Sequence, residues 1–108
     1  MDRRIEEFLK SLGKEGAALV KDEVQTFFQE SVADGDDFTK QLKLDIEQYT
    51  LQLALSDITK SDYEMYLRSQ ARQMRSHLIG IEVSKRATAQ RVLDGLQDLL
   101  LAKLIPLL

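Results

Sequence analysis

The first residue to consider for chemistry is His77, the only histidine among the 108 residues. Histidine often serves as a general base or as a metal ligand near neutral pH. Di-iron helical proteins need two Glu-x-x-His motifs, which a single histidine cannot provide. The residues around it also lack a local signature of a Ser-His-Asp site. On a helical wheel His77 lies beside the apolar stripe, so we interpret it as a boundary residue without a ligand.

Other patterns that could support catalysis or metal binding also fail. The sequence has no cysteine, which excludes disulfides, zinc–thiolate sites and cysteine nucleophiles. Residues 34–37 are acidic like a calcium loop, but the fifth loop position would be Phe38, so we interpret them as a turn followed by an N-cap at Asp37. Residues 13–16 lack the spacing of a P-loop. We therefore predict no catalytic, cofactor-binding or metal-binding residue, and hence no enzyme.

Four arginines form the one charged feature that stands above the background. Arg68, Arg72, Arg75 and Arg86 fall on a ridge that flanks the apolar stripe of the C-terminal half. Such a ridge could contact phosphates, but the chain has a net charge of −3 and no basic–aromatic motif of a nucleic-acid reader. Residues 1–60 contain 8 Lys/Arg and 13 Asp/Glu, a net −5, whereas residues 61–108 contain 7 and 5, a net +2. We predict that the ridge pairs with the acidic first half or with another subunit, and not with nucleic acid.

Three helices are expected in the first 60 residues, at residues 2–12, 15–32 and 38–56, with a break or kink at residues 13–16. The third helix is apolar on two opposite sides, which predicts neighbours on both sides. A strand interpretation of its alternating leucines is rejected, because the intervening residues are poor strand formers and no hairpin turn separates the two runs. One stripe is Leu42, Ile46, Tyr49 and Leu53, and the other is Leu44, Leu51, Leu55 and Ile58.

The C-terminal half, residues 61–105, dominates the predicted architecture. Apolar residues recur there at helical spacing, no proline occurs before Pro106, and residues 61–64 match the S-x-x-E capping box. As one helix this segment would be about 67 Å long. A compact domain of this size has a radius of gyration of only about 13 Å. Either the helix bends, at Gly80 or at Gly95, or a second copy covers its apolar stripe.

The last segment, residues 96–108, has two interpretations. It can be core or a subunit interface, or it can be an interfacial membrane anchor with Lys103 at the polar boundary. Asp94, Gln97 and Asp98 do not resemble the basic face of a membrane-surface helix. The apolar run at residues 99–108 is also about half as long as a membrane span requires. We favour core or interface.

The predicted fold class is all-α: one domain, residues 1–108, forming an antiparallel helical bundle of about four helical segments with a long C-terminal helix, completed by self-association as a dimer. No cofactor is expected. The predicted function is a non-catalytic assembly or adaptor module that binds a second copy or a protein partner through an apolar helix face. The alternative is a peripheral membrane- or lipid-binding protein that uses the C-terminal helix. The lack of cysteine and of a secretory signal suggests a cytoplasmic location. The predicted interface residues are Met74, Leu78, Ile81, Val92, Leu96, Leu99, Leu100 and Leu104.

Overall fold

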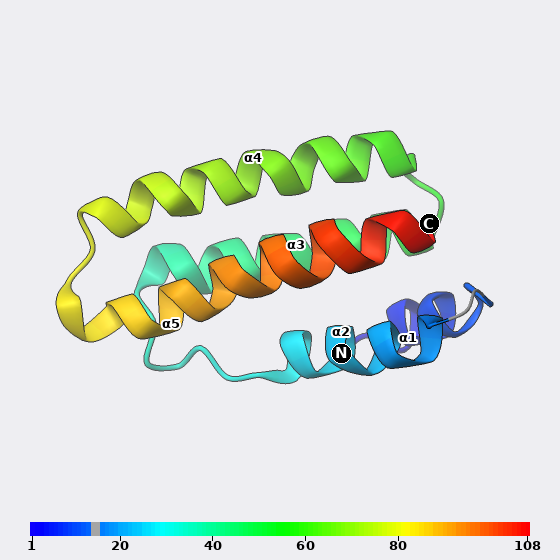
Figure 1. Ribbon diagram of the computed structural model, residues 1–108, viewed down its shortest axis with the longest axis horizontal. Helices are drawn as coiled ribbons and strands as arrows, with labels where there is room; N and C mark the ends of the chain where they lie inside the picture. The colour runs from blue at the N-terminus through cyan, green and yellow to red at the C-terminus, as the bar shows by residue number, and fades with distance from the viewer. Residues whose placement is uncertain (14–15) are drawn as a thin grey trace.

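The computed structural model describes residues 1–13 and 16–108, and every regular element in these residues is a helix (Figure 1). The predicted all-α class is therefore confirmed. The start predicted at residue 15 for the second helix lies outside the described residues. The elements are α1 (Arg3–Lys10), α2 (Ala17–Gln29), α3 (Asp37–Ala54), α4 (Lys60–Ile79), α5 (Val83–Asp94), the π-helix η1 (Gly95–Leu104) and the short 3-10 helix η2 (Ile105–Leu107).

Polar caps determine where α3 and α4 begin. The Asp36 carboxylate accepts a hydrogen bond of 3.1 Å from the backbone N–H three residues later, so Asp36 is the N-cap and the prediction of Asp37 is wrong by one residue. At α4, Thr59 and Asp62 exchange side chain–backbone hydrogen bonds of 3.1 and 3.2 Å. The capping box therefore lies two residues before the predicted one. Neighbouring Asp, Ser and Thr residues are comparable caps, and the local sequence does not choose among them.

The chain reverses its direction at Gly80. Helix α4 ends at Ile79 and α5 begins at Val83, and the two helices then run side by side in opposite directions (Figure 1). At Gly95 the backbone stays helical, so α5 continues directly into η1. The molecule measures 41 Å along its longest axis, well below the length of an unbroken C-terminal helix. An unbroken helix over residues 61–105 is therefore excluded, and of the two bends that the sequence left open, the chain bends at Gly80.

This bend buries the apolar stripe inside a single chain. Leu78, one of the eight residues predicted to form an interface, is half-buried and packs against the core. The stripe therefore needs no second copy to cover it. Self-association was predicted because this stripe was thought to be uncovered, and that reason no longer holds. The other seven predicted interface residues are all buried in the core: Met74, Ile81, Val92, Leu96, Leu99, Leu100 and Leu104.

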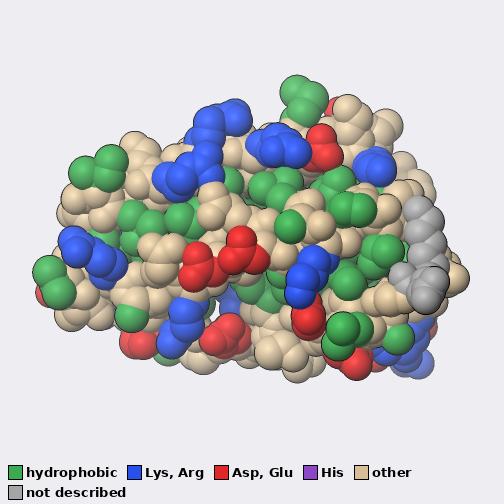
Figure 2. Space-filling view, viewed as in Figure 1, with side chains coloured by type: hydrophobic (Ala, Val, Ile, Leu, Met, Phe, Trp, Pro, Cys, Tyr) green, Lys and Arg blue, Asp and Glu red, His purple; other side chains and the backbone are tan. Residues whose placement is uncertain are grey.

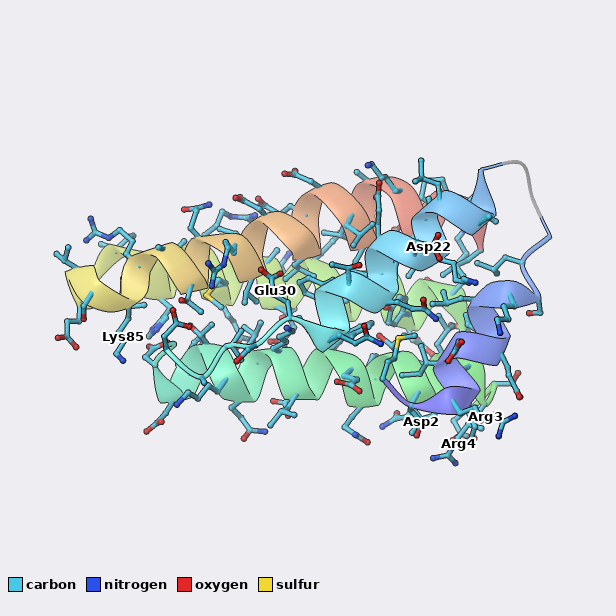
Figure 3. The ribbon with its side chains drawn as sticks, turned by 90° about the horizontal axis from the view of Figure 1, so that it is seen from below. Asp2, Arg3, Arg4, Asp22, Glu30 and Lys85 are labelled. Atoms are coloured by element: carbon cyan, nitrogen blue, oxygen red, sulfur yellow. The ribbon has the colours of Figure 1, made fainter. Side chains whose placement is uncertain are left out.

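Helix α2 packs closely on η1 because Gly95 leaves room for an aromatic ring. A Cβ atom built on Gly95 would lie 2.3 Å from Cε2 of Phe27. The ammonium of Lys43 lies 5.3 Å from the centre of the same ring and donates a hydrogen bond to the carbonyl of Glu30 at the end of α2. These contacts hold α2 against the C-terminal half, while α1 packs on α3 (Figure 3).

Helix α3 is well covered on one side and partly covered on the other. On its first apolar stripe Leu42, Ile46 and Leu53 are buried, and Tyr49 is partly buried against the core. On the second stripe, Leu51 is half-buried against the core, whereas Leu44 and Leu55 are 56% and 44% exposed. The prediction of packing on both sides is thus wrong for the two exposed leucines.

Candidate functional site

A groove of about 530 Å³ lies between α4 and η1, and three of the four ridge arginines line it. The arginines stand on the α4 wall and Asp98 on the η1 wall. On this side of the molecule, Figure 2 shows basic side chains along α4 and both acidic and basic ones over the neighbouring α5–η1 segment. The groove is therefore bordered by side chains of opposite charge. Its lining residues are Arg68, Ala71, Arg72 and Arg75 from α4, and Gln97, Asp98, Leu101 and Ala102 from η1.

The arginine wall follows from the helical spacing of α4. Residues at positions i, i+4 and i+7 share one helix face, which brings Arg68, Arg72 and Arg75 to the same side. On the adjacent face of α4, Leu67 and Met74 are buried in the core. Their packing fixes the position of the arginine wall at the edge of the core. The grouping of these three arginines agrees with the sequence prediction. Arg86, the fourth ridge residue, is exposed on α5 and does not line the groove.

The opposite wall belongs to a π-helix, a form that is rare and often found at functional sites. Leu96, Leu100 and Leu104, four residues apart, are fully buried on its inner side. Asp98 and Leu101 lie on the groove side. The sequence did not predict this wall, because leucines four residues apart also suit an ordinary α-helix. Only the reversal at Gly80 brings the wall next to α4.

The ridge arginines have few partners of their own. Nε of Arg68 lies 3.7 Å from Oε2 of Glu64, one turn earlier on α4. Within residues 1–13 and 16–108, Arg72, Arg75 and Arg86 have no carboxylate oxygen within 4.0 Å. Two adjacent guanidinium groups of the groove are therefore available to a ligand.

Charge pairing between the acidic first half and the second half does occur, but through other cations. Nε of Arg91 lies 3.6 Å from Oε1 of Glu30, a residue at the end of α2 beside α5 (Figure 3). Nζ of Lys103 lies 3.1 Å from Oε2 of Glu23. Among the described residues, the prediction that the ridge itself pairs with the first half is wrong, whereas pairing with another subunit stays a prediction.

The C-terminal segment packs against the rest of the chain. Leu100, Leu104 and Ile105 are buried, and Lys103 pairs with α2. These side chains are therefore not available as a membrane-facing surface in the folded chain. Within residues 1–13 and 16–108, none of the helices is both long enough and apolar enough to cross a bilayer.

His77 connects the end of α4 to the start of α3. Its ring stacks on Phe38 with centroids 4.2 Å apart, and its Nε2 contacts Oδ2 of Asp36. Burial opposes ionisation of Asp36, but hydrogen bonds from Thr39 and His77 outweigh it and hold the pKa of Asp36 below its usual value. The part of the chain that is described contains no cluster of three or more His, Asp or Glu residues that could hold a metal ion. The contacts of His77 thus join two helices.

The chemistry available in the groove is ligand binding. Guanidinium groups form paired hydrogen bonds with carboxylates, and Leu101 and the adjacent alanines offer apolar contact. Among residues 1–13 and 16–108, no Ser, Thr, Lys or His lines the groove, so the described lining contains none of these nucleophiles and no histidine base.

Comparisons of this chain with models of protein families, with curated proteins and with solved structures find no match.

Proposed function

We propose that this chain is a non-catalytic protein-interaction module that holds an acidic, amphipathic segment of a partner protein in the groove between α4 and η1. The observation that carries the proposal is the row of Arg68, Arg72 and Arg75 along one wall of a partly apolar groove. Arginine suits this task, because its planar guanidinium binds carboxylates with two parallel hydrogen bonds. The apolar helix face that was expected to bind a partner lies in the core, so the groove takes its place.

The spacing of the arginines favours a helical ligand. The three residues are separated by four and three positions along α4, which correspond to about 6 and 4.5 Å along the axis. A partner helix with carboxylates at positions i, i+4 and i+7 would present them at the same intervals. Ala71 and Ala102 are small enough to let a second helix approach, and Leu101 can contact an apolar side chain.

Asp98 favours a protein segment over a nucleic acid. It lies in the groove opposite the arginines, where it repels an evenly charged phosphate backbone. The net charge of −3 for the whole chain adds to this repulsion. A protein segment can instead place a neutral or basic residue opposite Asp98 and keep its carboxylates for the arginines.

Fluorescence anisotropy with a labelled helical peptide tests the proposal. The peptide carries Glu at positions i, i+4 and i+7 and Leu or Ala on the adjacent face, and a scrambled peptide serves as the reference. We expect Arg72→Gln combined with Arg75→Gln to weaken binding by up to about 30-fold, because each lost pair contributes up to about 1 kcal/mol. Binding should also weaken as salt concentration rises.

The matched control combines Arg3→Gln with Arg86→Gln. It removes the same charge, but Arg3 lies at the start of α1 and Arg86 lies outside the groove (Figure 3). An equal loss of affinity in this control would show a general effect of net charge and would refute the docking site. If the wild type bound duplex DNA tightly and only the groove variant abolished that binding, the groove would be a nucleic-acid site and not a site for a protein segment.

Self-association and a cytoplasmic location remain proposals. The residues expected to form the dimer interface lie in the core of one chain. A dimer therefore needs either a different surface or an exchange of helices between two copies. The lack of cysteine supports a reducing compartment such as the cytoplasm.

A further inference from the structure

We infer that two copies of this chain can exchange their α5–η1 segments, and that in the exchanged dimer residues 60–104 form one continuous helix. The inference rests on the self-association proposed above and is independent of ligand binding in the groove. In the exchanged dimer, the apolar surface that α2, α3 and α4 form is covered by the α5–η1 segment of the second copy.

The hinge for this exchange is short and poorly capped. Three residues, 80–82, connect α4 to α5. Gly80 has φ −108° and ψ 8° and donates its N–H to the carbonyl of His77 at 3.3 Å, so α4 does not end in the left-handed cap that commonly closes a helix. Glu82, the N-cap of α5, accepts no hydrogen bond through its side chain. A continuous helix would pair the backbone groups left free at these two helix ends.

Two exposed apolar side chains flank the hinge. Ile79 and Val83 are 85% and 77% exposed, the highest values among the large apolar side chains of the described residues. They are four residues apart, so they would share one face of a continuous helix. In an exchanged dimer the hinge segments of the two copies lie beside each other, and these faces can bury one another. This contact would explain why two large aliphatic residues stand at the tip of the molecule.

The surface that receives the exchanged segment already exists. In the single chain, α5 and η1 pack on α2, α3 and α4 through buried residues such as Leu96 and Leu100. Exchange repeats the same contacts between two chains. The equilibrium between monomer and exchanged dimer is therefore decided by the hinge and by the contact between the two hinge segments. The continuous helix would be about 67 Å long, whereas one folded chain measures 41 Å. It therefore cannot fold back on its own chain and requires a second copy.

Refolding at high protein concentration, followed by light scattering on separated species, tests this inference. Gly80→Ala favours the continuous helix, and an added Cβ meets no atom within 4 Å in the closed chain. We expect it to raise the dimer association constant about fivefold for each hinge, and about 25-fold for both. Ser84→Ala is the control, because residue 84 is helical in both forms.

Glu82→Pro should have the opposite effect. The φ of −56° at Glu82 suits proline in the closed hinge, whereas in a continuous helix the ring would clash with the carbonyl of Leu78. This variant should therefore stay folded and monomeric. If Gly80→Ala did not fold, a wild-type dimer that Glu82→Pro abolishes would still support the inference, and a dimer that Glu82→Pro leaves unchanged would overturn it.

Cross-linking identifies the exchange directly. The sequence has no cysteine, so Arg72→Cys and Asp98→Cys place single thiols on the two sides of the groove for a short bifunctional reagent. We expect separated dimers to yield covalently linked chain pairs and monomers to yield internal cross-links. A dimer with internal cross-links alone would refute the exchange and leave self-association intact. A monomer at every concentration, in the wild type and in Gly80→Ala, would refute both.

Discussion

Asp36 makes two contacts that belong to different parts of the fold. Its carboxylate caps α3 through the N–H of Thr39, and it also contacts the ring of His77 from α4. Both contacts favour the charged carboxylate and explain the lowered pKa of Asp36. Because the pKa in the folded chain is below that in the unfolded chain, this stabilisation is present at pH values above the unfolded pKa of about 3.9. It is lost as the pH falls through the lower, folded pKa.

Asp36→Asn tests this local contribution. Asparagine remains a good N-cap, so the substitution mainly removes the charge that faces His77. We expect the free energy of unfolding to fall by about 1 kcal/mol at pH 7, and the difference from the wild type to shrink toward pH 3. Urea unfolding across this pH range measures the effect. Asp37→Asn, at the next and exposed residue, should leave the pH dependence close to that of the wild type.

At the scale of helices, the two sides of α3 are buried to different extents. It packs on α4, on α5 and on α1, yet part of its second stripe faces solvent. Burial of an unpaired carboxylate destabilises a protein strongly, whereas a charge on the surface has little effect. The same substitution at different positions of this one helix should therefore report how well each side is covered.

Leu53→Asp, Leu51→Asp and Leu44→Asp form such a series, from buried through half-buried to exposed. We expect losses in the free energy of unfolding of about 4 kcal/mol, about 1–2 kcal/mol and at most about 0.5 kcal/mol, respectively. Thermal melts followed by circular dichroism provide the measurement. Equal losses at Leu51 and Leu53 would instead support the two-sided packing that the sequence predicted, and a large loss at Leu44 would place that residue in an interface.

At the scale of the whole molecule, the C-terminal segment completes the core. Deletion of residues 96–108 removes five buried apolar side chains: Leu96, Leu99, Leu100, Leu104 and Ile105. Each contributes about 1.5–3 kcal/mol, and together they rival the 5–15 kcal/mol that is typical of a whole domain. We expect the truncated chain to lose its cooperative thermal transition, measured by circular dichroism.

The control deletion removes only residues 106–108, of which Pro106 is exposed and the two leucines are half-buried. It should retain a cooperative transition at a moderately lower temperature. Flotation with anionic vesicles provides the second measurement. A long truncate that melts like the wild type, together with full-length protein that binds vesicles through the deleted segment, would favour the membrane alternative over a role in the core.

The sequence by itself determined the local features of this protein. Apolar residues at helical spacing, together with a single proline close to the C-terminus, were sufficient to predict an all-helical chain. The spacing of Arg68, Arg72 and Arg75 predicted that they share one face, because that relation depends only on the geometry of one helix. At α3 an aspartate cap was predicted one residue too late, and at α4 a capping box was predicted two residues too late and with other residues, since several neighbouring residues could serve.

Only the tertiary structure decided between Gly80 and Gly95 as the place of the bend. The β-branched residues around Gly80 made it the weaker point of the helix in the sequence, but the sequence left both glycines open as the place of the bend. In the structure, Phe27 packs against the bare Cα of Gly95, whereas no atom lies within 4 Å of a Cβ built on Gly80. That contact joins residues far apart in the chain, so no local pattern contains it. The resulting reversal buries the stripe that had suggested a dimer and places Asp98 and Leu101 opposite the arginines. The groove thus depends on how two helices pack against each other, which helical periodicity alone does not specify.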